Sequence, residues 1–418
     1  QTEEQNVGTV ISTKRKRFYP PSLAGELYPN GIPIVSEKEL PELIEREKVD
    51  LVCFAYSDVS HEHVMHLASI AMSKGAGFLL LGPKQTMLKS KKPVIAITAS
   101  RTGAGKSSVT RKICSILKEF GVKFVVVRHP MSYGDLEKQR CQRFASFADL
   151  DKHNCTIEER EEYEPLIARG YVVYAGVDYS EILKRAEEEA EVIIWDGGNN
   201  DYPFFRPDLW LCVCDAFARA GEELRSFPGE VNLRMADVVI INKVGRGREE
   251  AVDIIKRNVK RVNERAEIVL ADSVVKVDKP RLLRGKRAVI IEDSPTVTHG
   301  GLPYGAGYIA ALKYNAREII DPRPYAVGSI KDAYAKYRQL GPILPALGYG
   351  KKQMEELEKT INKIDCDAVI LGTPSDISRY LNIKVPVVHV FYELKEIDKP
   401  GLEEILVEFL EKYGLLKG

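Results

Sequence analysis

The residues best suited to chemistry in this 418-residue chain form one glycine-rich segment, residues 99–108, which reads Ala-Ser-Arg-Thr-Gly-Ala-Gly-Lys-Ser-Ser. Gly103 and Gly105 allow the main chain to curl so that its N–H groups meet a phosphate. Lys106 offers an ammonium to the β- and γ-phosphate oxygens, and the Ser107 hydroxyl can bind Mg²⁺. The segment predicts a nucleoside triphosphate site made by Thr102, Gly103, Ala104, Gly105, Lys106, Ser107 and Ser108.

The match is to the second half of the phosphate-loop motif, because Ser100 stands where the full pattern has glycine. Arg101 stands where a subclass of P-loop proteins that includes dethiobiotin synthetase and MinD-like ATPases places an extra cation. We predict a catalytic role for Arg101; a solvated loop arginine is the alternative. A glycine turn followed by an unrelated Lys-Ser pair is the alternative for the whole segment.

A phosphate loop needs a carboxylate at the end of a neighbouring strand to hold Mg²⁺ through its water shell. Asp196 ends the apolar run 192–195 and is predicted to have this role together with Ser107, although a plain strand-ending turn would look similar. Asp135 follows the apolar run 124–127 and is predicted to be catalytic as a second metal-shell or nucleophile-positioning group.

P-loop proteins that select guanine usually recognise the base with an Asn-Lys-x-Asp loop. The aspartate carboxylate of this loop accepts hydrogen bonds from two N–H groups of guanine. Here Asn242 and Lys243 are present, but Gly245 takes the place of the aspartate. The sequence therefore disfavours guanine and favours adenine, with Asn242 pairing with the purine edge and Lys243 lying along the ring. ATP is the predicted nucleotide, and a bare turn is the alternative.

Other loops combine glycine with cations at strand ends, where ligands bind in open α/β sheets. His299, Gly300 and Gly301 lie in the most glycine-rich of these loops, whose alternative is an irregular connection. Guanidinium groups suit phosphate and carboxylate. Arg206 and Arg323 are therefore predicted to bind a small anionic, phosphorylated substrate, although each arginine taken alone could be a surface residue.

Alternating apolar runs and helical patterns predict an α/β fold with a mainly parallel sheet. We expect a Rossmann-like domain over residues 1–92, a P-loop domain over 93–285 and a C-terminal α/β region over 286–418 that completes the substrate site. The expected strands begin at Leu51, Gly77, Val94, Phe124, Val192, Leu211, Val238, Ala288, Asp367 and Val387.

The amino-acid composition argues against two classes of protein. A net charge of +1 argues against a generally basic nucleic-acid binder, and the absence of an apolar run of membrane-spanning length argues against a membrane protein. The 7 cysteines form no Cys-x-x-Cys pair, so we expect a cytoplasmic protein, with Cys212 and Cys214 in the core. We also expect a homodimer.

The loop motifs, taken in their order along the chain, resemble the archaeal P-loop family of cyclic 2,3-diphosphoglycerate synthetases, also described as predicted GTPases. The similar segments include residues 101–107, 128–135, 196–201, 298–307 and 321–329. The resemblance implies an ATP-driven closure of 2,3-diphosphoglycerate to its cyclic anhydride, with release of ADP and phosphate. This reaction requires a cationic pocket that holds the two phosphates of the substrate together, for which Arg128, His129, Arg206 and Arg323 are the candidates. As a hypothesis, residues 299–307 close over the substrate.

Two other functions remain open from the sequence. A P-loop kinase of a small phosphorylated acid would use the same loop without ring closure. A regulatory GTPase would act on no small substrate and would prefer GTP.

Overall fold

The computed structural model describes residues 17–129, 135–197, 201–217, 219–293, 297–298, 303–347, 351–374 and 376–416. These residues form two compact units. The larger unit contains residues up to 145 together with 170–273 and 394 onward, and the smaller unit contains 146–169 and 274–393. The chain thus leaves and re-enters the larger unit, whereas the expected domains are continuous segments; their boundaries at 92 and 285 stay predictions.

The larger unit is built on a parallel sheet with the strand order β14-β13-β11-β6-β10-β7-β9, to which β8 adds an antiparallel edge. The predicted strands of this unit are confirmed. The strands are β6 (Val94–Ala99), β7 (Phe124–Arg128), β8 (Gln142–Phe144), β9 (Val172–Ala175), β10 (Val192–Asp196), β11 (Leu209–Asp215), β13 (Val238–Asn242) and β14 (Glu267–Val277). Every residue of β6 is buried, since β10 and β11 flank it and helices cover both faces.

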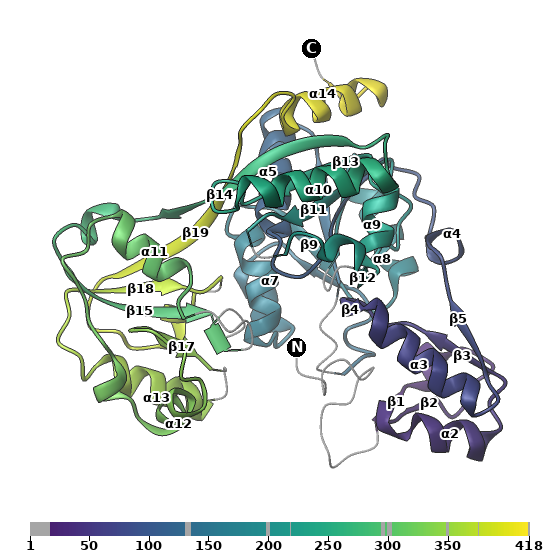
Figure 1. The fold of residues 1–418 in the computed structure, drawn as a ribbon, viewed down its shortest axis with the longest axis horizontal. Helices are drawn as coiled ribbons and strands as arrows, with labels where there is room; N and C mark the ends of the chain where they lie inside the picture. Colours follow the sequence, from purple (N-terminus) through teal and green to yellow (C-terminus); the bar gives the residue numbers. More distant parts are fainter. Residues whose placement is uncertain are drawn as a thin grey trace. The chain divides into compact units, whose positions relative to one another are not determined.

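Successive side chains of β6 point to opposite faces of the sheet. Val94 and Ala96 pack in a core with residues of α8 (Tyr179–Glu189), α9 (Gly229–Met235) and α10 (Glu249–Val262). That core also contains Cys212 and Cys214, as predicted. On the other face α5 (Lys106–Glu119) packs against β6 and is contacted by α14 (Leu402–Lys412) (Figure 1).

The start of the described chain forms a small lobe within the larger unit. Its parallel strands β3 (Leu51–Phe54) and β5 (Gly77–Leu80) pair with each other, and α2 (Leu40–Glu47) and α3 (His61–Ser73) accompany them. A short strand, β4 (Val59–Ser60), pairs with β12 (Ser226–Phe227), which precedes α9. Because β4 pairs with β12, the loop that precedes β4 lies beside the segment between β11 and α9. The lobe also contains β1 (Arg17–Tyr19), α1 (Pro21–Ala24), β2 (Ile32–Ile34) and α4 (Pro83–Thr86).

The strands of the smaller unit are parallel: β15 pairs with β16, β17 and β18, and β18 pairs with β19. Ala288 and Ile290 pack toward α11 on one face, while Val289 and Ile291 pack toward α12 and α13 on the other (Figure 1). The elements are α6 (Phe147–Lys152), α7 (Ile157–Ile167), β15 (Arg287–Asp293), α11 (Ala306–Lys313), β16 (Glu318–Ile319), α12 (Gly328–Lys336), β17 (Leu344–Ala346), α13 (Lys351–Ile361), β18 (Ala368–Gly372) and β19 (Val387–Glu396).

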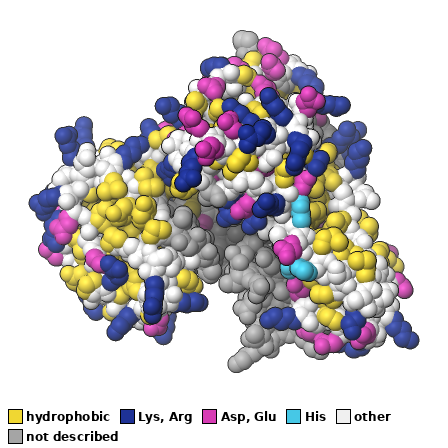
Figure 2. Space-filling model, in the orientation of Figure 1, with side chains coloured by type: hydrophobic (Ala, Val, Ile, Leu, Met, Phe, Trp, Pro, Cys, Tyr) yellow, Lys and Arg dark blue, Asp and Glu magenta, His cyan; other side chains and the backbone are white. Residues whose placement is uncertain are grey.

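The surface carries charges of both signs. Lysine and arginine side chains alternate with acidic ones over the face shown in Figure 2, in agreement with a net charge of +1. Within the described ranges, no helix combines the length and apolarity that a membrane crossing would require.

Candidate active site

The predicted phosphate loop joins the central strand β6 to α5, which begins at Lys106. Gly103 has φ +88° and Gly105 has φ +105°, a conformation that side-chain-bearing residues rarely adopt. A Cβ at Gly105 would also collide with the side-chain amide of Asn242. Glycine is therefore required at position 105 by both the turn and the close approach.

Lys106 is the centre of a buried ionic cluster at the carboxyl ends of β10 and β7. Its Nζ lies 2.6 Å from Asp196 Oδ1, and Arg128 binds the other carboxylate oxygen of Asp196. Burial raises the pKa of Asp196, but the charges of Arg128 and Lys106 outweigh burial and hold that pKa below its usual value. Burial lowers the pKa of the Lys106 ammonium. Two cations share one carboxylate, so the cluster retains a positive charge that suits a phosphate.

The two serines after Lys106 face different surroundings. Ser107 is exposed at the start of α5, whereas Ser108 is buried and its hydroxyl donates to Gly105 O at 2.7 Å. The Ser107 hydroxyl and the Asp196 carboxylate are oxygen ligands of the kind that Mg²⁺ prefers. The described part of the chain has no cluster of three or more His, Cys, Asp or Glu side chains arranged for a metal. A P-loop ion does not need one, because nucleotide phosphates and water supply most of its ligands.

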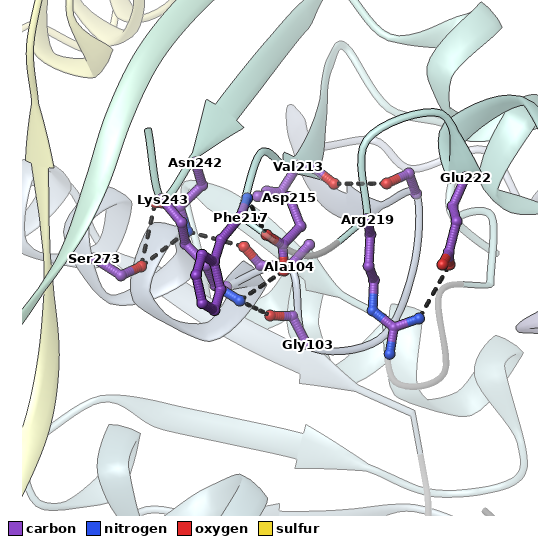
Figure 3. Close-up of polar contacts among 12 residues, drawn as sticks. Gly103, Ala104, Val213, Asp215, Phe217, Arg219, Glu222, Asn242, Lys243 and Ser273 are labelled. Carbon is purple, nitrogen blue, oxygen red and sulfur yellow. Dashed lines mark hydrogen bonds and ion pairs between the residues drawn. The ribbon is translucent and has the colours of Figure 1, made fainter. Parts of the chain in front are cut away.

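Asn242, the last residue of β13, and Lys243, which follows it, bind main-chain carbonyl groups of the phosphate loop through their side chains (Figure 3). Asn242 Nδ2 donates to Ala104 O at 2.8 Å and to Ser273 Oγ at 2.9 Å. Lys243 Nζ donates to Gly103 O at 2.6 Å and lies 2.7 Å from Asp215 Oδ2. Both hydrogens of the Asn242 amide are thus used inside the protein, so its placement differs from the prediction that this amide pairs with a purine edge.

Arg101 is bound to carboxylates. Its Nε lies 3.3 Å from Asp58 Oδ1 and 3.7 Å from Glu222 Oε2. Asp58 Oδ1 also accepts a hydrogen bond from the Thr102 main-chain N–H at 3.3 Å. The small lobe at the start of the chain therefore contacts the phosphate loop directly.

His129 follows Arg128 at the end of β7 and forms a pair with Asp201. His129 Nδ1 lies 2.8 Å from Asp201 Oδ2. Burial raises the pKa of Asp201, but the partner His129 reverses this and the pKa is held below its usual value. The ionised carboxylate can orient the imidazole beside the cluster of Lys106 and Asp196.

The other predicted site residues lie apart from this cluster. Asp135 is in an exposed turn, where its Oδ1 accepts from Glu137 N at 3.0 Å. Arg206 is exposed, and its main-chain N–H donates to Leu88 O. Arg323 belongs to the smaller unit, where it is exposed and pairs with Asp321 at 2.5 Å. The predicted substrate residues His299, Gly300 and Gly301 lie outside the described residues.

Sequence reasoning missed Asp58 and Asp215. Asp215 ends an apolar run on β11 just as Asp196 ends one on β10, so the same signal could have found it. Asp58 has φ +58°, and neither its conformation nor its contact with Arg101 has a signal in the local sequence.

No model of a protein family matches the chain. Among solved structures, LpxK from Aquifex aeolicus in complex with ATP has a TM-score of 0.47 and 12% identity, covering 85% of this chain and 96% of that one. MinD of Aquifex aeolicus has a TM-score of 0.25 and 18% identity, covering 43% of this chain and 80% of that one.

The family predicted from the sequence is represented by a distant relative. Cyclic 2,3-diphosphoglycerate synthetase of Thermococcus sibiricus is 23% identical over 296 residues, which are 65% of each chain. Arginine synthetase ArcE of Thermococcus kodakarensis is 59% identical over 409 residues, which are 98% of this chain and 91% of the relative. With this identity over nearly its whole length, the chain belongs to the family of arginine synthetase ArcE.

Proposed function

We propose that the chain is an ATP-dependent synthetase that forms arginine and releases ADP and phosphate. The 59% identity with an arginine synthetase over 98% of the chain carries the choice of product. The glycine turn of the loop and the buried Lys106 support the choice of a nucleoside triphosphate. The missing aspartate of the Asn-Lys-x-Asp pattern supports ATP over GTP.

The product suggests the chemistry. The guanidino carbon of arginine bears three nitrogens, so a synthetase that completes this group replaces an oxygen on that carbon by nitrogen. Transfer of the γ-phosphoryl group breaks its bond to ADP and forms a bond to the acceptor oxygen. An amine then attacks the carbon, the C–O bond breaks, and phosphate leaves. Phosphoryl transfer depends mainly on positioning and charge stabilisation.

The cluster around Lys106 fits this role. Lys106 and Arg128 supply positive charge where negative charge accumulates on the transferred group. Ser107 and Asp196 would hold Mg²⁺, which when bound neutralises the β- and γ-phosphate oxygens. With Asp201 facing Nδ1 of His129, Nε2 is left as the acceptor for a proton from the incoming amine.

The distant relative favours cyclisation of 2,3-diphosphoglycerate as a second candidate. In that reaction Arg128 and His129 would bind the second phosphate, which attacks the activated first one. The two candidates share the loop and differ in the acceptor.

The test uses the purified chain with ATP and Mg²⁺. One reaction contains ¹⁵N-ammonium and citrulline, the ureido analogue of arginine, and labelled arginine is measured by mass spectrometry. A parallel reaction contains 2,3-diphosphoglycerate and is followed by phosphorus NMR. We expect labelled arginine with equimolar ADP and phosphate. A cyclic anhydride without arginine would replace our proposal by the second candidate, and phosphorylated substrate without free phosphate would indicate a kinase.

Replacing Lys106 tests whether the loop is the catalytic site. Lys106→Ala should lower turnover by at least about a thousandfold, because the transferring phosphoryl group loses its ammonium. Lys112→Ala, on the partly exposed side of the same helix, serves as the control and should keep turnover near the unchanged protein. Equal rates for the two variants would contradict a catalytic phosphate loop.

A further inference from the structure

A carboxylate from another strand lies beside Gly245, the position at which the Asn-Lys-x-Asp pattern has its aspartate. Asp272 lies on β14, beside β13, and a Cβ at Gly245 would come within 2.5 Å of Asp272 Oδ2. The carboxylate of Asp272 therefore fills the space beside residue 245, where the pattern would place its own aspartate.

Asp272 keeps one oxygen available. Its Oδ1 accepts from the Ser273 N–H at 2.9 Å, and no residue of the described chain donates a hydrogen bond to its Oδ2. The side chain is half-buried, and Gly245 beside it is exposed. The neighbouring Asn242 and Lys243, by contrast, are bound to the phosphate loop.

An exposed aromatic ring lies at the same group of strand ends. Phe217 follows β11, its N–H donates to Asp215 Oδ1 at 2.8 Å, and its side chain is 50% exposed (Figure 3). The two loops are packed together, since a Cβ at Gly247 would lie 2.7 Å from Ala216 O. A ring exposed in this way offers a stacking surface to a flat heterocycle.

We propose that Asp272 is the residue that selects the nucleobase, with Oδ2 accepting a hydrogen from the exocyclic amino group of adenine and Phe217 stacking on the ring. This inference rests on the nucleotide binding proposed above. One available oxygen matches the single amino group of adenine. A carboxylate recognises guanine by accepting its two N–H donors with both oxygens, and Oδ1 of Asp272 is already bonded to the Ser273 N–H.

The test measures the binding of four probes by calorimetry in the presence of Mg²⁺: ATP, purine riboside triphosphate, which lacks the amino group, GTP and inorganic tripolyphosphate. We expect ATP to bind about 10- to 100-fold more tightly than purine riboside triphosphate, as charged hydrogen bonds do. Asp272→Ala should abolish that difference and leave tripolyphosphate unchanged. Asp253→Ala, an exposed aspartate on α10, is the control and should keep it.

Two further variants guard against a local folding defect at position 272. Gly245→Ala should displace the carboxylate and reduce the discrimination between ATP and purine riboside triphosphate. Phe217→Ala should weaken ATP, GTP and purine riboside triphosphate by a similar factor and spare tripolyphosphate.

Equal binding of ATP and purine riboside triphosphate by the unchanged protein would overturn the role of Asp272, as would discrimination that survives Asp272→Ala. Tighter binding of GTP than of ATP would overturn the assignment of adenine. Failure of tripolyphosphate and ATP alike to bind would instead reject the proposed function itself, and this inference with it.

Discussion

Ser107 and Ser108 are adjacent in the chain but have different chemical roles. The Ser107 hydroxyl is exposed at the helix start, and that of Ser108 is already bonded to Gly105 O. Ser107→Ala should therefore lower Mg²⁺-supported turnover by about 10- to 100-fold and raise the Mg²⁺ concentration needed for half-maximal rate. Ser108→Ala should lower the stability by about 1 kcal/mol and leave the Mg²⁺ dependence in place. Rates titrated against Mg²⁺ distinguish these outcomes, and an unchanged titration for Ser107→Ala would remove this residue from the metal site.

At the scale of single residues, the sequence predicts the loop but not its neighbours. The chemistry of Gly105 and Lys106 can be predicted from their residue types alone; in the structure Gly105 has φ +105° and Lys106 pairs with Asp196. The contact of Asp58 with Thr102 joins residues 44 positions apart. Such pairs depend on the packing of the lobe, so spacing along the chain does not reveal them. The same is true of Asp272 beside Gly245.

At the scale of elements, β19 carries an imidazole held between two carboxylates of the smaller unit. His389 Nδ1 lies 3.1 Å from Asp278 Oδ2, and Nε2 lies 2.9 Å from Asp376 Oδ1. The hydrogen bond with Asp376 raises the pKa of His389 above 6.5. Burial raises the pKa of Asp376, but the hydrogen bond from His389 outweighs burial and holds that pKa far below its usual value. The charged pair therefore persists between these two pKa values.

This pair predicts a pH dependence of stability. A histidine whose pKa is raised by folding contributes its full stability below the unfolded pKa and loses it as the pH rises through the folded pKa. The free energy of unfolding should thus fall as the pH rises from about 6.5 through the raised pKa of His389. Urea unfolding across this range measures the change, and His389→Gln should flatten it. A slope that persists in that variant would assign the effect to another group.

The strand predictions succeeded where a continuous apolar run marks the strand, whether it is buried throughout, as β6 is, or partly exposed, as β3 and β5 are. β6, β10 and β13 are buried throughout, and their continuous apolar runs identify them in the sequence. β14 alternates between buried and partly exposed residues, and its apolar run 268–271 could have been predicted, although Asp272 and Ser273 interrupt the strand pattern. β9 has an apolar run and could have been predicted, whereas β16 and β17 are too short to leave a pattern.

At the scale of the whole molecule, the units are discontinuous in sequence, although the apolar runs suggested successive segments. Residues 146–169 group with the smaller unit and residues 394 onward with the larger one. Grouping of this kind follows from packing between distant segments, and single-sequence periodicity contains no information about it. The homodimer stays a prediction that light scattering in solution can test.

The helix α14 should stabilise the larger unit. Leu402, Leu406 and Leu410 are buried, and the helix contacts α5, which carries Lys106. Leu410→Ala should lower the free energy of unfolding by about 2–5 kcal/mol, the usual cost of a cavity in a core. Glu411→Ala, at an exposed neighbour, should change it by no more than about 0.5 kcal/mol. Urea unfolding provides the comparison, and equal values for the two variants would show that α14 is not part of this core.

The return of the chain to the larger unit after residue 393 has a consequence for biosynthesis. A ribosome makes α5 and its phosphate loop early, yet α14, which covers α5, emerges only after all of the smaller unit has been made. The face of α5 that α14 contacts therefore stays uncovered while the smaller unit is translated. A nascent chain arrested before α14 should therefore expose this face to chaperones, and release of the helix from the exit tunnel should end that exposure.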